Sequence, residues 1–343
     1  MILYIILAVI GLFVLIALSV GYFLSAPGYD GTSSDHFNGK RFLNPDNVEA
    51  KGFADVLKWG LNREQGSWTM NYETFMGKVP EKPTDSTIKI TFVNHSTFLI
   101  QTRDLAILTD PVWSDRASPF RIAGPKRYRP PGILFEDLPK IDLVLLSHNH
   151  YDHLDLPTIK RLETDHQPLF IVPLGVAAFL SDYISNIKET DWWESMEYMT
   201  STIHSVPAIH FSGRGMFDRD KTLWSGYVLE LNKKKIYFAG DTGYGGVFKK
   251  IGDRFSSIDV SLIPIGAYKP KWFMSPIHIS PEEAVKVHQD VNSKQSIAIH
   301  FGTFALADEG QGQAETDLQK AMNSRNIPKN QFMVPEEGET ILF

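Results

Sequence analysis

The order of apolar and polar positions divides this chain into three parts. Residues Ile2 to Leu24 form a continuous apolar run without a charged side chain, and residues 25–86 are irregular and frequent in Pro, Gly, Asp and Asn. From Thr87 onward, short runs rich in Val, Ile, Leu and Phe are separated by turn residues, which is typical of strands. We therefore expect an anchor at 1–25, an irregular extension at 26–86 that packs on the core, and a folded domain at 87–343.

The pattern predicts that the domain combines strands with helices. The predicted strands are Ile88–Val93, Thr97–Thr102, Ala106–Thr109, Leu143–Leu146, Leu169–Val172, Gly226–Leu231, Lys235–Ala239, Val260–Ile263 and Ser296–His300. The predicted helices are Phe53–Leu61, Pro157–Glu163, Gly175–Tyr183, Pro281–Asn292 and Ala314–Asn326. Early hairpins followed by strand–helix alternation predict an α/β fold in which helices cover two sheets.

The N-terminal apolar run is long enough to cross a membrane. At about 1.5 Å per helical residue, Ile2–Leu24 can span a hydrocarbon core of about 30 Å. A cleaved signal peptide is the alternative, but no Lys or Arg precedes the run, and Pro27 follows the small residues Ser25 and Ala26 at the place where cleavage would fall. We therefore expect an uncleaved single-pass membrane anchor, whose orientation no nearby positive charge decides.

The amino-acid composition limits which partners and which metal ligands the chain can have. The 343 residues are 43% hydrophobic and 22% charged, as in an ordinary globular protein, and they carry a formal net charge of −6. This charge gives no general attraction to nucleic acid, so we expect no nucleic-acid partner. Cysteine is absent, which excludes disulfides, thiolate metal ligands and thiol nucleophiles. Any transition metal must therefore be bound by histidine and carboxylate side chains.

The most informative motif directly follows the predicted strand Leu143–Leu146. It contains His148, His150, Asp152 and His153. Period-two alternation places the first two histidines on one side of the chain as it leaves the sheet, and the next turn delivers the other two side chains from a different direction. Three imidazoles are costly to bury without partners, whereas nitrogen and carboxylate ligands suit zinc. The motif therefore predicts a metal site in which one loop serves two ions.

Three more candidates stand where predicted strands end. His210, Asp241 and His300 each follow a short apolar run, and strand ends are where binding residues are usually presented. Each of them alone has an ordinary structural explanation, such as the turn that an Asp-Thr-Gly sequence forms. Their order after the first motif favours a shared site.

That order resembles the pattern of the metallo-β-lactamase superfamily, from about residue 87 to the end of the chain. The resemblance implies a metallo-β-lactamase-like αββα sandwich, preceded here by the transmembrane helix, with two zinc ions at one edge. One ion would be held by His148, His150 and His210, and the other by Asp152, His153 and His300. Asp241 would bridge the pair. Two such ions activate water for hydrolysis at neutral pH.

A closer resemblance, to the N-acylphosphatidylethanolamine-hydrolysing phospholipase D branch of that superfamily, rests on segments outside the ligands. These segments are Arg41–Pro45, Leu108–Pro111, Leu223–Gly226, Gly266–Pro270, Trp272–Met274, His278–Ala284 and Ala298–Ala307. The resemblance implies cleavage of N-acylphosphatidylethanolamine to N-acylethanolamine and phosphatidic acid.

The branch also implies roles for individual residues. Asp152 and Asp241 would act in catalysis together with His278, which would bind substrate and stabilise or protonate the leaving alkoxide. Tyr151 would line the same substrate pocket. The alternatives are a helix-entry histidine oriented by the acids that follow it, and a tyrosine that only packs. Ile277 stands where the animal members of the branch have glutamine, which leaves head-group recognition open.

A basic loop adds a second link to membranes. Its basic residues are Arg116, Arg121, Lys126, Arg127 and Arg129, with no acid between them. Such a loop can rest on anionic head groups or attract a phosphate, and the alternative is a solvated surface loop. The expected partners are therefore a membrane phospholipid as substrate and the membrane surface, while a homodimer stays open.

Several other polar residues have weaker patterns. We expect His95 behind the metal ligands rather than among them, and Arg214 either to meet a phosphate or to pair with Asp218. The histidines expected to be structural are His36, His166, His204 and His288.

The main hypothesis is thus a membrane-anchored, zinc-dependent phosphodiesterase of the phospholipase D type. The closest alternative is another hydrolase on the same fold, such as a lactonase or a phosphodiesterase with a different substrate. A nuclease is disfavoured by the acidic balance of the chain. A non-catalytic membrane scaffold is disfavoured by the full ligand set, since a structural zinc ion needs only four ligands.

Overall fold

Two stacked β-sheets form the body of the protein. The computed structural model describes residues 1–70 and 81–343. The first sheet has the strand order β14 (Thr340–Leu342), β1 (Lys89–Asn94), β2 (Thr97–Gln101), β3 (Ala106–Thr109), β4 (Leu143–Leu145), β5 (Leu169–Pro173), β6 (Ile187–Thr190). The second has the order β13 (Phe332–Met333), β12 (Ser293–Ile299), β11 (Ile258–Pro264), β10 (Lys234–Phe238), β9 (Ser225–Leu231), β8 (Ser201–Pro207), β7 (Ser195–Tyr198).

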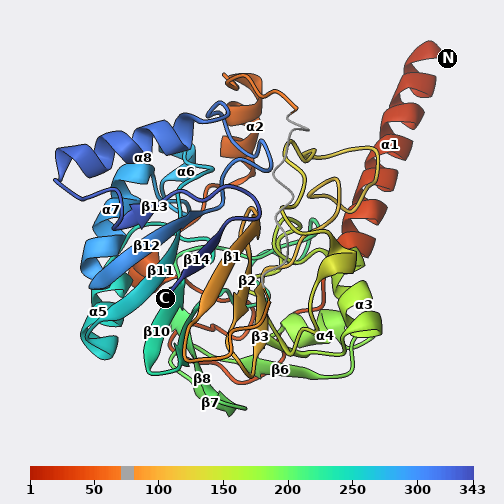
Figure 1. Ribbon diagram of the computed structural model, residues 1–343. Coiled ribbons are helices and arrows are strands. Elements are labelled where there is room, and N and C mark those ends of the chain that lie inside the picture. Colours follow the sequence, from red (N-terminus) through yellow and green to blue (C-terminus); the bar gives the residue numbers. More distant parts are fainter. Residues whose placement is uncertain (71–80) are drawn as a thin grey trace.

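Helices cover the outer faces of both sheets. The helical elements of the described chain are α1 (Ile2–Leu24), η1 (Pro45–Asn47), α2 (Phe53–Leu61), η2 (Phe135–Asp137), α3 (Leu156–Asp165), α4 (Val176–Leu180), α5 (Val247–Phe255), α6 (Lys271–Met274), α7 (Pro281–Asp290) and α8 (Gln313–Ser324), and only some of them cover the sheets. In Figure 1, α3 and α4 lie on the outer side of the first sheet, while α5, α7 and α8 lie on the outer side of the second. The αββα sandwich that the sequence implies is confirmed.

Strand direction gathers several strand ends at one edge. Strands β3, β4 and β5 pair in parallel, and so do β10, β11 and β12. Strand β8 is antiparallel to β9, which is antiparallel to β10, so β8 also runs in the direction of β10. The carboxyl ends of these strands therefore lie at the same edge of their sheets, which is where ligands bind in such folds.

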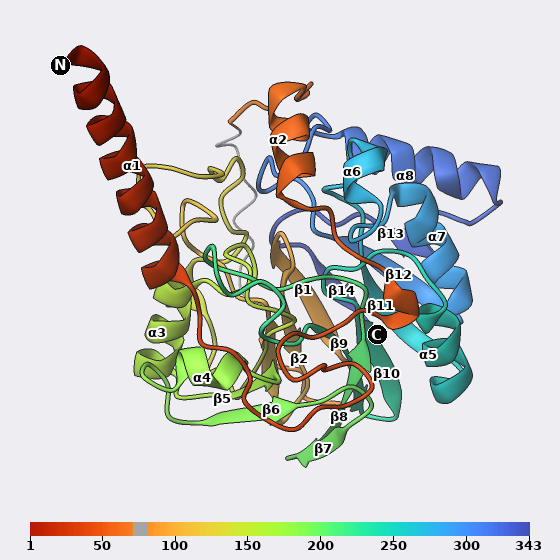
Figure 2. The ribbon, with the colours of Figure 1, turned by 180° about the vertical axis from the view of Figure 1, so that it is seen from behind.

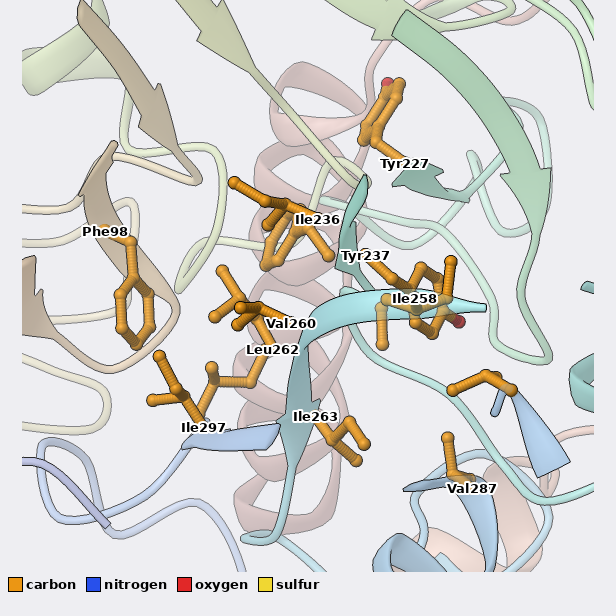
Figure 3. Packing of buried hydrophobic residues seen from close by; sticks show 14 of the residues in the cluster. Phe98, Tyr227, Ile236, Tyr237, Ile258, Val260, Leu262, Ile263, Val287 and Ile297 are labelled. Carbon is orange, nitrogen blue, oxygen red and sulfur yellow. The ribbon is translucent and has the colours of Figure 1, made fainter. Parts of the chain in front are cut away.

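The largest apolar cluster fills the space between the two sheets. Figure 3 shows Val260 and Leu262 of β11 pointing toward Phe98 of the opposite sheet, together with Ile297 of β12. On the other face of β11, Ile263 lies toward Val287 of α7. All these side chains are buried, which makes the central strands a rigid support for the loops at their ends.

The hydrophobic pattern located the central strands but missed several elements. Strands β6, β7, β8, β13 and β14 and helices α5 and α6 were not predicted. The predicted starts of α2 and α7 are confirmed, and Ser280 caps α7 by accepting a hydrogen bond from the backbone N–H of Glu283. The missed strands are at or near sheet edges or mix polar residues into both faces, so they lack a clean period-two signal.

The N-terminal region wraps onto the domain after α1. Phe37 and Phe42 are buried against Ala208, Leu223 and Trp224. Helix α1 itself is apolar and almost wholly exposed, and it is long enough to cross a membrane. Figures 1 and 2 show it standing apart from the body, on the side of α3 and rising toward the end where α2 lies.

Candidate metal centre

The predicted ligands converge from loops at the ends of strands of both sheets. His148, His150, Asp152 and His153 follow β4 of the first sheet, while His210 follows β8 of the second. Asp241 follows β10 and His300 follows β12. Gly240, with φ +61°, lets this strand end approach the first sheet, because a Cβ there would lie 2.7 Å from the Cβ of Ser147.

The first group of donors contains His148, His150 and His210. Nε2 of His148 lies 2.8 Å from Nδ1 of His150, which in turn lies 3.3 Å from Nε2 of His210. These three nitrogens and no carboxylate form one candidate metal group, which is the set that the superfamily resemblance implied for one ion.

The second group contains Asp152, His153 and His300. The Oδ2 atom of Asp152 lies 3.4 Å from Nε2 of His153 and 3.3 Å from Nε2 of His300. His95 belongs to the same group, because its Nε2 lies 3.1 Å from that oxygen. The turn between β1 and β2 thus brings the His95 ring to the same carboxylate, and the expectation that His95 stands behind the ligands stays a prediction.

Asp241 lies between the two groups. Its Oδ2 atom is 3.2 Å from Nε2 of His153 and 3.1 Å from Nε2 of His300. The same atom is 3.7 Å from Nε2 of His210 and 4.0 Å from Nε2 of His148. One carboxylate oxygen thus faces donors of both groups, as a bridging position requires.

The charges of the cluster fit divalent cations. Burial favours the neutral form of Asp241, but His153 and His300 outweigh burial and hold its pKa well below the usual range. Burial likewise opposes protonation of His153, but the carboxylates of Asp241 and Asp152 raise the pKa of that imidazole well above its ordinary value. Buried carboxylates therefore require positive charge here, and a metal ion supplies it without a proton.

Unpartnered donor atoms support the same conclusion. Nε2 of His153 and Oδ1 of Asp241 are buried and have no hydrogen-bond partner within residues 1–70 and 81–343. Leaving such atoms unsatisfied is costly, and a set of nitrogen and carboxylate donors is what divalent transition metals prefer. The cluster is therefore a site that fits divalent metal ions.

Asp110 is the functional residue that sequence reasoning missed. Its Oδ2 atom lies 2.6 Å from Nδ1 of His153 and accepts a hydrogen bond from Oγ of Ser147 at 2.6 Å. A carboxylate on the far ring nitrogen fixes which nitrogen faces the metal. On the second sheet, the carbonyl oxygen of Ile277 lies 2.9 Å from Nδ1 of His210 and has the same effect.

Three residues of the centre have a strained backbone conformation. His95, Asp110 and His300 all have positive φ values, of 47°, 34° and 58°. Residues other than glycine rarely adopt this conformation, and surrounding structure must hold them in it. The three turns therefore place side chains at the cost of local backbone strain.

His278 faces the centre rather than the helix that follows it. Its Nδ1 atom lies 3.9 Å from Oδ2 of Asp241 and has no hydrogen-bond partner in the described chain. The acids of the helix are occupied elsewhere, since Glu283 bonds Ser280 and Glu282 pairs with Lys286. Burial lowers the pKa of His278 to about 4, so the ring is neutral at neutral pH.

Tyr151 and Arg214 brace the loop that carries the motif. The Tyr151 hydroxyl donates to the carbonyl of Arg214 at 3.0 Å, and the guanidinium lies 3.9 Å from the centre of the Tyr151 ring. That guanidinium donates to the carbonyls of Asn149 and Leu154. The guanidinium is therefore engaged with backbone oxygens, and the pairing with Asp218 is made by the backbone N–H of Arg214 instead; a contact of Arg214 with phosphate stays a prediction.

The basic loop is only partly a surface feature. Arg127 is buried, where it donates to the carbonyls of Ser114 and Val112, and burial lowers its pKa to about 10. Arg129 lies 3.5 Å from the carboxylates of Glu315 and Glu337. These two residues were expected on an exposed basic loop, and the structure uses them inside the fold.

A cleft lies beside His210 of the first donor group. It has a volume of about 810 Å³, and we call it the His210 cleft because that histidine lines one end. Its other walls come from the N-terminal extension, including Phe42, Phe53 and Val56, and from Phe211 and Met216 in the loop after His210. The cleft thus lies between the loop after His210 and the N-terminal extension, and it is lined by apolar side chains together with charged ones such as Arg41 and Asp220.

The fold and this donor cluster define the class of protein. The family described as "Beta-lactamase superfamily domain" matches residues 106–301, and the chain belongs to this metallo-β-lactamase superfamily. The crystal structure of isothiocyanate hydrolase from Delia radicum gut bacteria has the same fold, with a TM-score of 0.60. It is 20% identical, and the match covers 74% of this chain and 98% of that chain.

Within the superfamily, the chain is similar to N-acyl-phosphatidylethanolamine-hydrolyzing phospholipase D. It is 40% identical over 269 residues to phospholipase D 1 of that name from Caenorhabditis elegans, which covers 74% of this chain and 76% of the relative. The mitochondrial protein of that name from Saccharomyces cerevisiae is 35% identical over 247 residues, covering 70% of this chain and 52% of the relative. The predicted resemblance is confirmed, and the chain is a hydrolase of the metallo-β-lactamase type.

Proposed function

We propose that this protein is a membrane-anchored, zinc-dependent phosphodiesterase that cleaves N-acylphosphatidylethanolamine to N-acylethanolamine and phosphatidic acid. The observation that carries the proposal is the position of Asp241, whose Oδ2 atom faces both donor groups and His278. The names of the C. elegans and S. cerevisiae relatives supply the substrate and the bond.

The donor groups give each proposed zinc ion its ligands. His148, His150 and His210 would hold one ion, and Asp152, His153 and His300 the other, with Asp241 shared between them. Two zinc ions in such a site supply an activated water and neutralise the charge of a phosphodiester. His95 is close enough to Asp152 to orient that carboxylate by a hydrogen bond.

His278 is placed to act on the leaving group. A neutral imidazole can donate one hydrogen bond, and Nδ1 of His278 has no protein partner among the described residues. A hydrogen bond from the ring to the leaving ethanolamide oxygen would stabilise the charge that develops as the P–O bond breaks. We propose that Tyr151, half-buried next to the motif loop, lines the same substrate pocket.

The N-terminal region supports a lipid substrate. Helix α1 can serve as a single-pass anchor, which would keep the donor cluster next to a bilayer. The His210 cleft offers apolar side chains beside the cluster, and this is the surface that an acyl chain needs.

Oxygen-18 labelling tests the proposed bond. Hydrolysis of N-acylphosphatidylethanolamine in labelled water should put the label into phosphatidic acid, because water attacks phosphorus and the ethanolamide oxygen leaves. His278→Ala should lower kcat by about 10²-fold while zinc content stays that of the wild type. Diacylglycerol or free fatty acid as the first product would reject this assignment and favour another hydrolase on the same fold.

A further inference from the structure

Helix α2 exposes an apolar stripe that no described part of the chain covers. Phe53, Leu57 and Leu61 are spaced by four residues, so they share one face of the helix. Their exposed fractions are 72%, 51% and 86%, and Val56 beside them is also exposed. Large apolar side chains that cluster on a surface in this way mark a place of contact.

The opposite side of α2 is fixed to the domain. The Trp59 ring stacks on Phe273 with the ring centres 5.0 Å apart, and its Nε1–H donates to a carboxylate oxygen of Asp308 at 3.0 Å. Lys58 lies 4.9 Å from the ring centre of Trp272. These contacts hold the helix with its apolar stripe facing outward, so the exposure follows from how the helix is seated.

Helix α1 is joined to the domain in a defined way. The carboxylate of Asp218 accepts hydrogen bonds from the backbone N–H groups of Ala26 and Gly215, at 2.8 and 2.9 Å. The backbone N–H of Met216 donates to the carbonyl of Gly21 at 3.2 Å, where the glycine lets the loop approach the helix. The end of α1 is therefore fixed on the loop that follows His210.

Both helices point to the same end of the molecule. In Figures 1 and 2, α1 rises beside the body toward the end that α2 occupies. A bilayer crossed by α1 would thus meet the end of the domain that carries the α2 stripe. The basic residue Lys51, just before α2, suits the anionic head groups found there.

We propose that α2 is an interfacial helix that inserts Phe53, Leu57 and Leu61 into the bilayer that α1 spans. An amphipathic helix with an outward apolar face and basic neighbours is the usual form of such a contact. Phe53 and Val56 also line the His210 cleft, so this contact brings the cleft to the lipid surface. The inference rests on the proposed membrane anchor and adds the surface through which the domain meets lipid.

A single label reports this contact directly. The chain has no cysteine, so Leu57→Cys in the full-length protein can carry one environment-sensitive fluorophore. In vesicles of phosphatidylcholine and phosphatidylglycerol, its emission should shift to the blue and be quenched by spin-labelled lipid. Thr200→Cys, exposed in the turn between β7 and β8, is the control that should stay in water. A protein that floats with vesicles while the Leu57 label remains unquenched overturns the inference and leaves the anchor intact.

A charge-insertion variant tests what the contact does. Leu57→Glu with Leu61→Glu should lower hydrolysis of vesicle-borne substrate by roughly tenfold and leave hydrolysis of detergent-dispersed substrate unchanged. Leu342→Glu, an exposed leucine on β14, is the matched control and should change neither rate. Equal rates for the double variant and the control on vesicles would overturn the inference.

The outcomes also separate the three hypotheses. If the full chain does not float with vesicles, both the anchor and the α2 contact are wrong. Flotation and quenching without phosphodiester cleavage would reject only the proposed reaction.

Discussion

Polar side chains are usually exposed and apolar ones buried, and the metal centre and the N-terminal helices depart from this in opposite directions. At the centre, carboxylates and imidazoles such as Asp241 and His153 are buried where water is excluded. On α1 and α2, large apolar side chains such as Phe13 and Leu61 are exposed where water would meet them. Each arrangement is costly for the chain alone.

The difference between the two regions identifies the kind of partner that each requires. Buried negative charge needs a cation, and the nitrogen and carboxylate donors of the centre select a divalent metal. Exposed apolar surface needs an apolar medium, and α1 is long and apolar enough to be a candidate membrane span. The following predictions separate these two requirements, beginning with the largest expected effect.

Removing the shared carboxylate should have the largest effect. Asp241→Asn keeps the shape of the side chain but removes the charge that faces both donor groups. We expect hydrolysis to fall on the order of 10³-fold and bound metal to fall from about two ions per chain to one or none. Elemental analysis and a phosphodiesterase assay check this, with the exposed Asp104→Asn as control. Full activity with one metal ion or none would exclude a dinuclear mechanism.

The sequence predicted most of this centre because its ligands form recognisable motifs. The loop after β4 brings four candidate donors in one motif, and the order of His210, Asp241 and His300 matched a known family. The contacts of Asp110 and His95 could not be predicted in this way, although the sequence did place His95 near the ligands. Each is a single polar residue in a turn, and only the folded chain shows that the first touches His153 and the second Asp152.

Asp110 should therefore matter through His153 rather than through the metal directly. Asp110→Asn would remove the charge on the far nitrogen of the imidazole, and loss of such a partner typically costs 10- to 100-fold in metal affinity, as an order-of-magnitude expectation. Competition with a chromogenic chelator measures the affinity. Excess zinc should restore much of the activity of this variant, whereas it should not restore Asp241→Asn. Wild-type affinity in Asp110→Asn would show that the contact has no role in metal binding.

The fold was predictable where burial dominates and less so at sheet edges. Central strands such as β11 and β12 end in short apolar runs, Leu262–Pro264 and Ile297–Ile299, that are buried on both faces. Strand β7 alternates exposed and half-buried residues, and β14 has no fully buried residue, so neither carries the hydrophobic signal of a core strand. Helix α5 was missed because Gly252 interrupts a short amphipathic segment whose apolar residues are buried.

Removing α1 should change the membrane association of the protein much more than its rate of hydrolysis. A chain that begins at Ser25 loses the apolar run but keeps Ala26 bonded to Asp218. We expect it to leave the membrane fraction after salt washing, and to hydrolyse detergent-dispersed substrate within about twofold of the full chain. Sedimentation and the same assay check both outcomes. Loss of bound metal in the truncated protein would show that the anchor and the centre depend on each other.

The smallest effect should come from a histidine that joins the N-terminal extension to the domain. His36 lies between Asp35 and Asp191, with Nδ1–Oδ1 and Nε2–Oδ1 distances of 2.6 and 2.7 Å, and its ring stacks on Trp192. Burial alone would lower the pKa of His36, but the hydrogen bonds to Asp191 and Asp35 outweigh it and raise the pKa above the ordinary value of 6.5. The folded chain therefore holds the proton more tightly than the unfolded chain.

Because the pKa of His36 is higher in the folded chain than in the unfolded chain, the stability of the protein should depend on pH. The contribution of protonated His36 is fully present below the ordinary pKa and is lost as the pH rises through the raised pKa of the folded state. We expect His36→Ala to lower Tm at about pH 6 by no more than about 2–4 °C, because the ion pairs are partly exposed. The difference from wild type should shrink toward about pH 9, leaving only the lost stacking on Trp192. Asp191→Asn should remove most of the pH dependence while keeping that stacking. A Tm difference between wild type and His36→Ala that is constant across this range would mean that His36 attaches the N-terminal extension by packing alone, as the apolar contacts of Phe37 and Phe42 do.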